Sequence, residues 1–207
     1  MNSCEKGPLL KPKAAGETVR GWGEDQSVLV AVAENGRGGG WLRPVDEAGA
    51  PAGPPERAAD LAAAVQRLER DHQPRWLWAA TSPLYSRLLA AGVRVGRCHD
   101  LALTEGLLLG YAGRWGQPRS VAAVLARRAG RPAPPDPQPA APRPANHQQD
   151  SLFETVGPEP EDPTADLVTA YLDQQARIAA IDQPGRFRLL VAAESAGALA
   201  AAEMGHE

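Results

Sequence analysis

The chain has 207 residues, a formal net charge of −3 and two cysteines, Cys4 and Cys98, in unlike contexts. This length allows one domain of ~100–150 residues with extra segments. The net charge argues against a basic nucleic-acid coat protein. The two cysteines argue against a disulfide framework or a zinc site. No apolar run approaches the ~18–20 residues that span a bilayer, and the N-terminal lysines precede no apolar segment, so we expect a cytoplasmic protein without a membrane partner.

The first part of the chain predicts a tail and a hairpin. Residues 1–26 are polar and lack periodicity, which indicates a loose tail. Residues 27–33 are nearly all apolar and predict a strand, and residues 41–45 predict the returning strand. The intervening Asn35-Gly36 and the glycines at 38–40 favour a tight reversal. These glycines could instead cradle a phosphate, but the Gly-Lys-Ser/Thr ending of a P-loop is missing.

A helix and a strand are predicted next. Residues 56–71 carry apolar side chains at helical spacing, with acidic residues early in the helix. Residues 76–80 are a short apolar run that is typical of a buried strand. Trp76 and Trp78 share one face of this strand, so we expect them in the core, although exposed tryptophans could stack on bases.

The stretch that ends at residue 110 repeats this alternation of strand and helix. Ser82 and Pro83, a capping hydroxyl and a first-turn proline, predict a helix that ends at Gly92. Residues 93–95 alternate apolar and polar side chains as in a second strand, and Asp100 can cap the helix that follows. Such a strand–helix–strand–helix unit predicts an α/β fold, a sheet covered by helices.

The remaining boundaries follow from composition. A short helix at 119–128 completes an α/β domain over residues 27–130. Seven prolines between residues 131 and 144 predict an extended linker, which we place at 131–163. A helical segment at 164–207 follows, with one helix opened by Thr164 or Asp166 and a second at about 188–204, judged from helical spacing.

Carboxylates in the predicted elements are the candidate catalytic groups. A metal-dependent nuclease needs several carboxylates that converge on two cations. The first strand offers only Glu34, and Asp100 and Asp173 are the other acidic candidates. Asp100 can equally be a helix cap and Asp173 a residue on a solvated helix face. The four histidines show no ligand spacing, so we expect no metal site built on them.

Several strings of the chain together resemble one family. They are Leu88-Leu89-Ala90-Ala91-Gly92-Val93-Arg94-Val95, Cys98-His99-Asp100, Glu105-Gly106-Leu107-Leu108-Leu109-Gly110, Ser151-Leu152-Phe153-Glu154, Tyr171-Leu172-Asp173-Gln174-Gln175, and Leu189-Leu190-Val191-Ala192-Ala193-Glu194-Ser195-Ala196-Gly197 with Ala202-Glu203-Met204. Their order and spacing resemble the N-terminal part of the actinobacterial A-family DNA polymerases described as bifunctional 3′–5′ exonuclease/DNA polymerase. The resemblance covers roughly residues 27–204. It implies a ribonuclease-H-like 3′–5′ exonuclease fold, a mixed sheet flanked by helices, and a role in DNA replication and repair.

The chain departs from the pattern of that family at the motifs that would bind metal. The Asp-x-Glu of the first strand is absent, and the aspartate of the second motif would fall near Leu84 or Tyr85. The third motif, a tyrosine four residues before an aspartate, places Thr169 opposite the tyrosine if Asp173 is the aspartate. We therefore expect a degenerate, inactive domain that would bind Mg²⁺ only if some exonuclease activity survived.

The ending of the chain is the second departure from the family. The resemblance implies that the chain stops where the polymerase thumb should begin, so we expect a truncated protein that touches DNA weakly, through its parent polymerase. The alternative is an active fragment with exonuclease or polymerase activity. Missing carboxylates count against the first activity, and the missing palm and fingers count against the second.

A separate motif lies inside the predicted linker. Residues 149–153 resemble the short Gln-x-x-Leu-Phe peptide by which bacterial replication and repair proteins dock on the sliding clamp, with Gln149, Leu152 and Phe153 as the matching positions. An extended tether that presents two apolar anchors and one amide suits a preformed groove. The chain could thus be a clamp-binding adaptor, or the two apolar residues could fold back on the domain.

We predict that the double variant Leu152→Ala/Phe153→Ala loses binding to the bacterial sliding clamp, because both apolar anchors are removed. Surface plasmon resonance on immobilised clamp measures the loss. The variant Pro158→Ala/Pro160→Ala is the control, since it alters the same predicted linker but spares the motif. Equal binding by the parent chain and the anchor variant would contradict the adaptor hypothesis.

Overall fold

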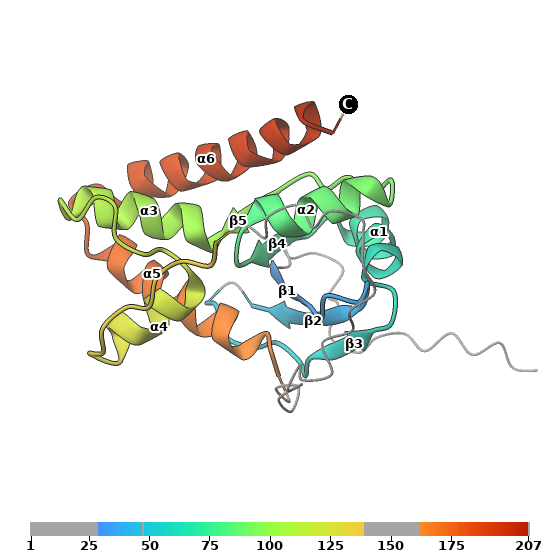
Figure 1. Cartoon of the computed structure of the whole chain (residues 1–207), viewed down its shortest axis with the longest axis horizontal. Coiled ribbons are helices and arrows are strands. Elements are labelled where there is room, and N and C mark those ends of the chain that lie inside the picture. The colour runs from blue at the N-terminus through green and yellow to red at the C-terminus, as the bar shows by residue number, and fades with distance from the viewer. Residues whose placement is uncertain (1–28, 47, 139–161, 207) are drawn as a thin grey trace, which may run out of the picture.

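A computed structural model of the chain describes residues 29–46, 48–138 and 162–206. Its five strands are β1 (Leu29–Glu34), β2 (Gly40–Val45), β3 (Glu56–Ala58), β4 (Arg75–Trp78) and β5 (Cys98–Asp100). They form one sheet in the order β3-β2-β1-β4-β5. β2 is antiparallel to both β1 and β3, whereas β4 is parallel to β1 and β5. The α/β class expected from the sequence is confirmed as a mixed sheet flanked by helices (Figure 1).

Helices cover both faces of this sheet. They are α1 (Leu61–His72), α2 (Thr81–Ala90), α3 (Leu101–Tyr111), α4 (Val121–Arg128), α5 (Ala165–Ala179) and α6 (Pro184–Met204). Apolar side chains of α1 and α2 pack on one face, and those of α4, α5 and the start of α3 pack on the other (Figure 1). Among the helices in the described ranges, none is both long and apolar enough to cross a bilayer.

β1 is the strand from which both core layers are built. Side chains alternate between the two faces of a strand, so residues two apart share a face. Val30 and Val32 pack with α1 and α2, while Leu29 and Ala31 pack with α4 and α5. All four are buried, which explains why this segment reads as a continuous apolar run in the sequence. The strand expected at 27–33 is thus confirmed for its described residues.

The predicted helix at 56–71 is wrong at its start. Residues 56–58 form β3, which pairs with β2, and the helix begins at Leu61. The Asp60 side chain accepts a hydrogen bond from the Ala63 N–H at 2.9 Å and so fixes the first turn there. As a strand, residues 56–58 pair with the backbone N–H and C=O groups at the open edge of β2. If the helix began at residue 56, those groups of β2 would lack this partner strand.

The region between α2 and β5 also differs from the prediction. Residues 93–95 are not a strand, because the Val93 N–H bonds to the Leu88 carbonyl at 2.8 Å and the Val95 N–H bonds to the Tyr85 hydroxyl at 3.4 Å. Their backbone therefore closes the end of α2. Both valines are still buried, which accounts for their apolar character. The edge strand forms instead at β5, a few residues later.

The remaining elements largely follow the prediction. Trp76 and Trp78 are fully buried in the core, as expected. The helix expected at 119–128 is α4, and α5 begins within a residue of the expected caps. α6 begins earlier than expected, at Pro184, a residue that fits the first turn of a helix because its missing N–H costs nothing there. The predicted tail at 1–26 lies outside the described residues, as does the linker except for 131–138 and its final residues.

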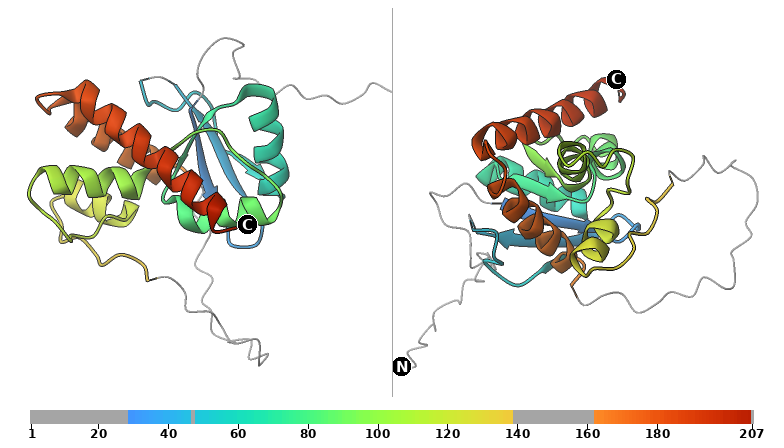
Figure 2. Two further views of the ribbon diagram at one scale, coloured as in Figure 1. Left: turned by 90° about the horizontal axis from the view of Figure 1, so that it is seen from above. Right: turned by 90° about the vertical axis from the view of Figure 1, so that its left-hand side faces the viewer.

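α6 lies on the outside of the molecule, across α3 and α2 (Figures 1 and 2). Its Glu203 accepts a hydrogen bond from the hydroxyl of the buried Tyr85 of α2 and forms an ion pair with Arg94 at 2.8 Å. Its Ser195 contacts β5, where the hydroxyl accepts from the Asp100 N–H at 3.4 Å. Through these contacts α6 joins the edge strand β5 to α2.

Asp100 connects three elements and is itself buried. One carboxylate oxygen accepts from the Leu103 N–H at 2.8 Å and caps α3, as predicted. The other oxygen accepts from the Thr81 N–H at 2.6 Å, so α2 begins at Thr81, one residue before the predicted cap at Ser82. A single carboxylate at the end of β5 thus fixes the first turn of two helices.

We predict that Asp100→Ala lowers the free energy of unfolding by about 2–4 kcal/mol, since it leaves two helix N–H groups unpaired, one of them buried. Asp60→Ala is the matched control, because it removes an exposed cap from α1 alone and should cost about 1 kcal/mol. Urea unfolding followed by circular dichroism measures both values. Equal losses in the two variants would show that Asp100 caps only one helix.

Candidate functional site

A hollow lies where β1 and β4 end. Parallel strands finish at the same edge of a sheet, and ligands of open α/β sheets bind beyond that edge. The hollow has a volume of about 580 Å³ and is bounded by the ends of β1 and β4, the first turns of α2, α3 and α4, Leu167 of α5 and residues 136–137. We call it the strand-end hollow. A metal-dependent nuclease on this sheet would assemble its carboxylates here.

The face of β1 that leads into the strand-end hollow carries alanines. Ala31 and Ala33 are two residues apart, so both point to the side of α4 and α5, and Ala33 lines the hollow. The two carboxylates of an Asp-x-Glu motif must share a face: on this face their positions hold Ala31 and Ala33, and on the other face Val32 stands two residues before Glu34. Leu167, the α5 residue at the hollow, is apolar as well. This part of the wall therefore offers methyl groups where metal ligands would stand.

Glu34 follows Ala33, so its side chain leaves β1 on the opposite face. Its carboxylate forms an ion pair with Arg87 of α2 at the rim of the hollow. Asp100 uses both oxygens as helix caps, and Asp173 forms an ion pair with Arg177 at 3.1 Å. The structure does not bring these three candidates together. Within the described ranges, no group of three or more His, Cys, Asp or Glu side chains could hold a metal ion.

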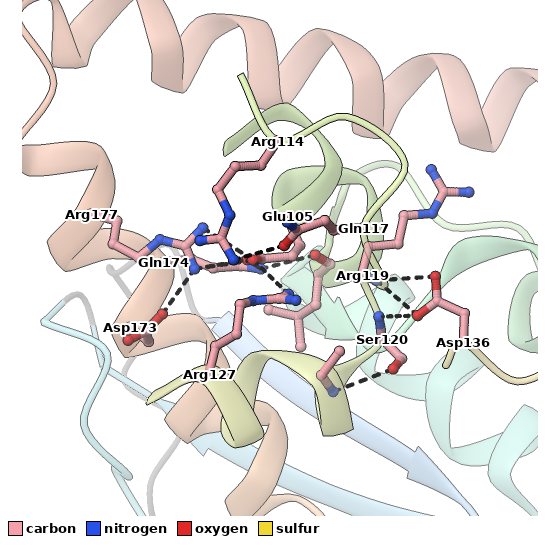
Figure 3. A network of polar contacts seen from close by, with 12 residues as sticks. Glu105, Arg114, Gln117, Arg119, Ser120, Arg127, Asp136, Asp173, Gln174 and Arg177 are labelled. Carbon is pink, nitrogen blue, oxygen red and sulfur yellow. Dashed lines mark hydrogen bonds and ion pairs between the residues drawn. The ribbon is translucent and has the colours of Figure 1, made fainter. Parts of the chain in front are cut away.

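Asp136 is a residue of the strand-end hollow that sequence reasoning missed. Its carboxylate accepts hydrogen bonds from the N–H groups of Arg119 and Ser120, at 2.7 to 3.0 Å, in front of the first turn of α4 (Figure 3). A negative charge is favourable at a helix N-terminus. The only signal in the sequence is that Asp136 is the sole acidic residue between residues 131 and 144. The start of the expected linker thus contacts the domain.

A buried ionic cluster joins α3, α4 and α5 (Figure 3). Glu105 of α3 is fully buried and pairs with Arg127 of α4 at 2.9 Å and with Arg177 of α5 at 3.0 Å. The Gln174 amide donates to the same carboxylate at 3.2 Å. A charge in this environment needs partners, and two guanidinium groups supply them. The signal in the sequence is that Glu105 is the one charged residue in a segment of mainly apolar residues.

Two further titratable groups, Cys98 and His99, are buried on β5. Burial lowers the pKa of His99 to about 4, so its imidazole is neutral at pH 7. Burial also raises the pKa of the Cys98 thiol to about 12, which keeps it protonated. The His99 ring packs edge-on against Tyr171, with centroids 5.0 Å apart. Neither group is poised as an acid, base or nucleophile at neutral pH.

The residues Gln149, Leu152 and Phe153 lie outside the described residues, so the clamp-binding hypothesis stays a prediction. Comparison of the chain with protein-family models, curated proteins and solved structures finds no match.

We predict that Glu105→Ala lowers the free energy of unfolding by about 3–5 kcal/mol, because the largely buried guanidinium of Arg127 and the partly exposed one of Arg177 lose their common partner. Asp173→Ala is the matched control: it removes the outer carboxylate of the same Arg177 and should cost less than about 1 kcal/mol. Denaturant unfolding of both variants checks the difference. A loss for Glu105→Ala as small as that of the control would contradict the assigned role of the cluster.

Proposed function

We propose that the chain is a catalytically silent 3′–5′ exonuclease-like domain of an A-family DNA polymerase, with a structural role in DNA replication and repair. The arrangement of the sheet supports this proposal. A meander of antiparallel strands, β3-β2-β1, is extended by the parallel strands β4 and β5 and is covered on both faces. This is the kind of mixed sheet that the ribonuclease-H-like fold requires.

One observation carries the proposed silence: the face of β1 that packs toward α4 and α5 carries Ala31 and Ala33, and Ala33 lines the hollow. Two-metal hydrolysis depends on carboxylates that hold cations about 3.5–4 Å apart, where they activate water and stabilise the leaving oxygen. Methyl groups cannot bind either cation. Glu34 also borders the hollow, but it is the only carboxylate of β1, leaves the strand on the other face and is paired with Arg87, so it does not supply a pair of metal ligands.

The same geometry gives the domain a structural use. Asp100 and Asp173, which could have been metal ligands, instead cap two helices and bind an arginine. Their charges are compensated without a metal, so the fold does not depend on one for its stability. In this proposal the domain keeps the shape of a nuclease and positions neighbouring parts of the polymerase by its surface.

We expect the chain to leave a labelled single-stranded oligonucleotide intact in Mg²⁺ or Mn²⁺. Gel electrophoresis of the products checks this, with a Glu34→Gln/Asp173→Asn variant alongside; Asp100 is kept because folding needs it. Isothermal titration with Mg²⁺ should show no binding. Cleavage by the parent chain that the variant loses would overturn the proposal, because the surviving carboxylates would then form a site.

A further inference from the structure

The connection between α3 and α4 carries a charge opposite to that of the chain as a whole. Residues 111–131 contain five arginines and no acidic residue, although the net charge of the chain is −3. Arg127 is neutralised by Glu105, but Arg114, Arg119, Arg128 and Arg131 are exposed. Within the described ranges, no carboxylate forms an ion pair with these four. Such a local excess of guanidinium groups attracts polyanions.

An aromatic side chain stands in the same connection. Trp115 is 79% exposed, whereas Trp76 and Trp78 are buried in the core. Its indole lies against Gly110 of α3 so closely that a Cβ built on this glycine would be 2.6 Å from the Trp115 Cη2. Because Gly110 has no side chain, the Trp115 ring can pack directly on the backbone of α3 at this position. The exposure of the rest leaves an aromatic surface open to solvent, as a base-stacking platform requires.

Arg119 lies next to this ring. Its guanidinium approaches Gly106, where a built Cβ would be 3.6 Å from the Arg119 Nη1. Gly106 and Gly110 are four residues apart and so share one face of α3, about 5–6 Å from each other. Trp115 and Arg119 also line one groove of about 420 Å³, together with Gln117. An indole and a guanidinium thus lie side by side over successive turns of one helix.

We infer that this groove binds single-stranded DNA, with a base stacked on Trp115 and an adjacent phosphate on Arg119. An open aromatic face beside a cation is the combination that single-strand-binding proteins use. The bases of a duplex are already stacked and paired, so a duplex could use only the arginines. Arg114, whose guanidinium donates to Gln117 at 2.7 Å, adds positive charge at the edge of the groove.

Two carboxylates, those of Asp136 and Glu194, also border the groove and bear on its affinity for single-stranded DNA. Asp136 is engaged with the N–H groups at the start of α4, where the helix dipole offsets its charge. Glu194 of α6 also lines the groove and is exposed. It repels a phosphate backbone and therefore weakens binding. Its removal should tighten the complex, which gives the inference a test of opposite sign.

This inference deepens the proposed function by naming what a silent domain would still bind. Binding is measured by the fluorescence anisotropy of a labelled oligothymidylate of about 15–20 nucleotides, long enough for one site. The full chain is used at low salt with EDTA, so that no metal-dependent cleavage contributes. A nuclease-active chain would overturn the proposed function and leave this result standing, whereas a chain that neither cuts nor binds would overturn only the inference.

We expect Trp115→Ala to weaken binding about 5–100-fold and Trp115→Phe to retain most of it, since a smaller ring still stacks. Arg119→Ala should lower the slope of log K against log salt by about 0.7–1, as loss of one phosphate contact does. Glu194→Gln should raise affinity. Arg70→Ala is the charge-matched control on α1, where Arg70 is exposed and paired with Asp71, and it should leave the salt slope unchanged.

Three results would overturn the inference. The first is the absence of measurable binding to the single strand, and the second is equal affinity for a duplex of the same length. The third is an affinity of Trp115→Ala equal to that of the parent chain. Circular dichroism of each variant accompanies the titrations, and Trp115 and Arg119, as exposed residues, can be replaced without opening the core.

Discussion

The alternation of side chains along β1 is the constraint on which the rest of the structure depends. β1 lies between an antiparallel hairpin partner and a parallel neighbour, and helices cover it on both faces. Every residue of its buried part must therefore suit one of two cores. The same alternation decides the chemistry at the strand end: Ala33 points to the side of α4 and α5, whereas Glu34 leaves β1 on the other side and pairs with Arg87 at the rim of the hollow. A shift of one residue would exchange their roles.

Much of the fold could be predicted because its signals are local. Apolar runs marked β1 and β4, helical spacing marked α1 and α4, and the capping character of Asp100 was visible beside the helix that it starts. The errors arose where distant partners decide. Residues 56–58 became a strand because β2 offers an open edge, and residues 93–95 lost their strand because their N–H groups bond to α2.

The candidate site was less predictable for the same reason. The sequence showed that the Asp-x-Glu of a nuclease is missing, but not that Arg87 binds Glu34, the only acidic side chain of β1. Glu105 and its two arginines come from three helices, and Asp136 reaches α4 from the proline-rich stretch. These contacts join residues that are far apart in sequence, and no periodicity reports them.

The packing of α6 against the sheet edge has a consequence for biosynthesis. Ser195 accepts from the Asp100 N–H of β5, and Glu203 from Tyr85 of α2, so the last described helix completes elements made about a hundred residues earlier. During translation the edge strand and α2 emerge from the ribosome long before their partner does. Until α6 has been synthesised, the apolar side chains that it covers stay open to chaperones and to other nascent chains.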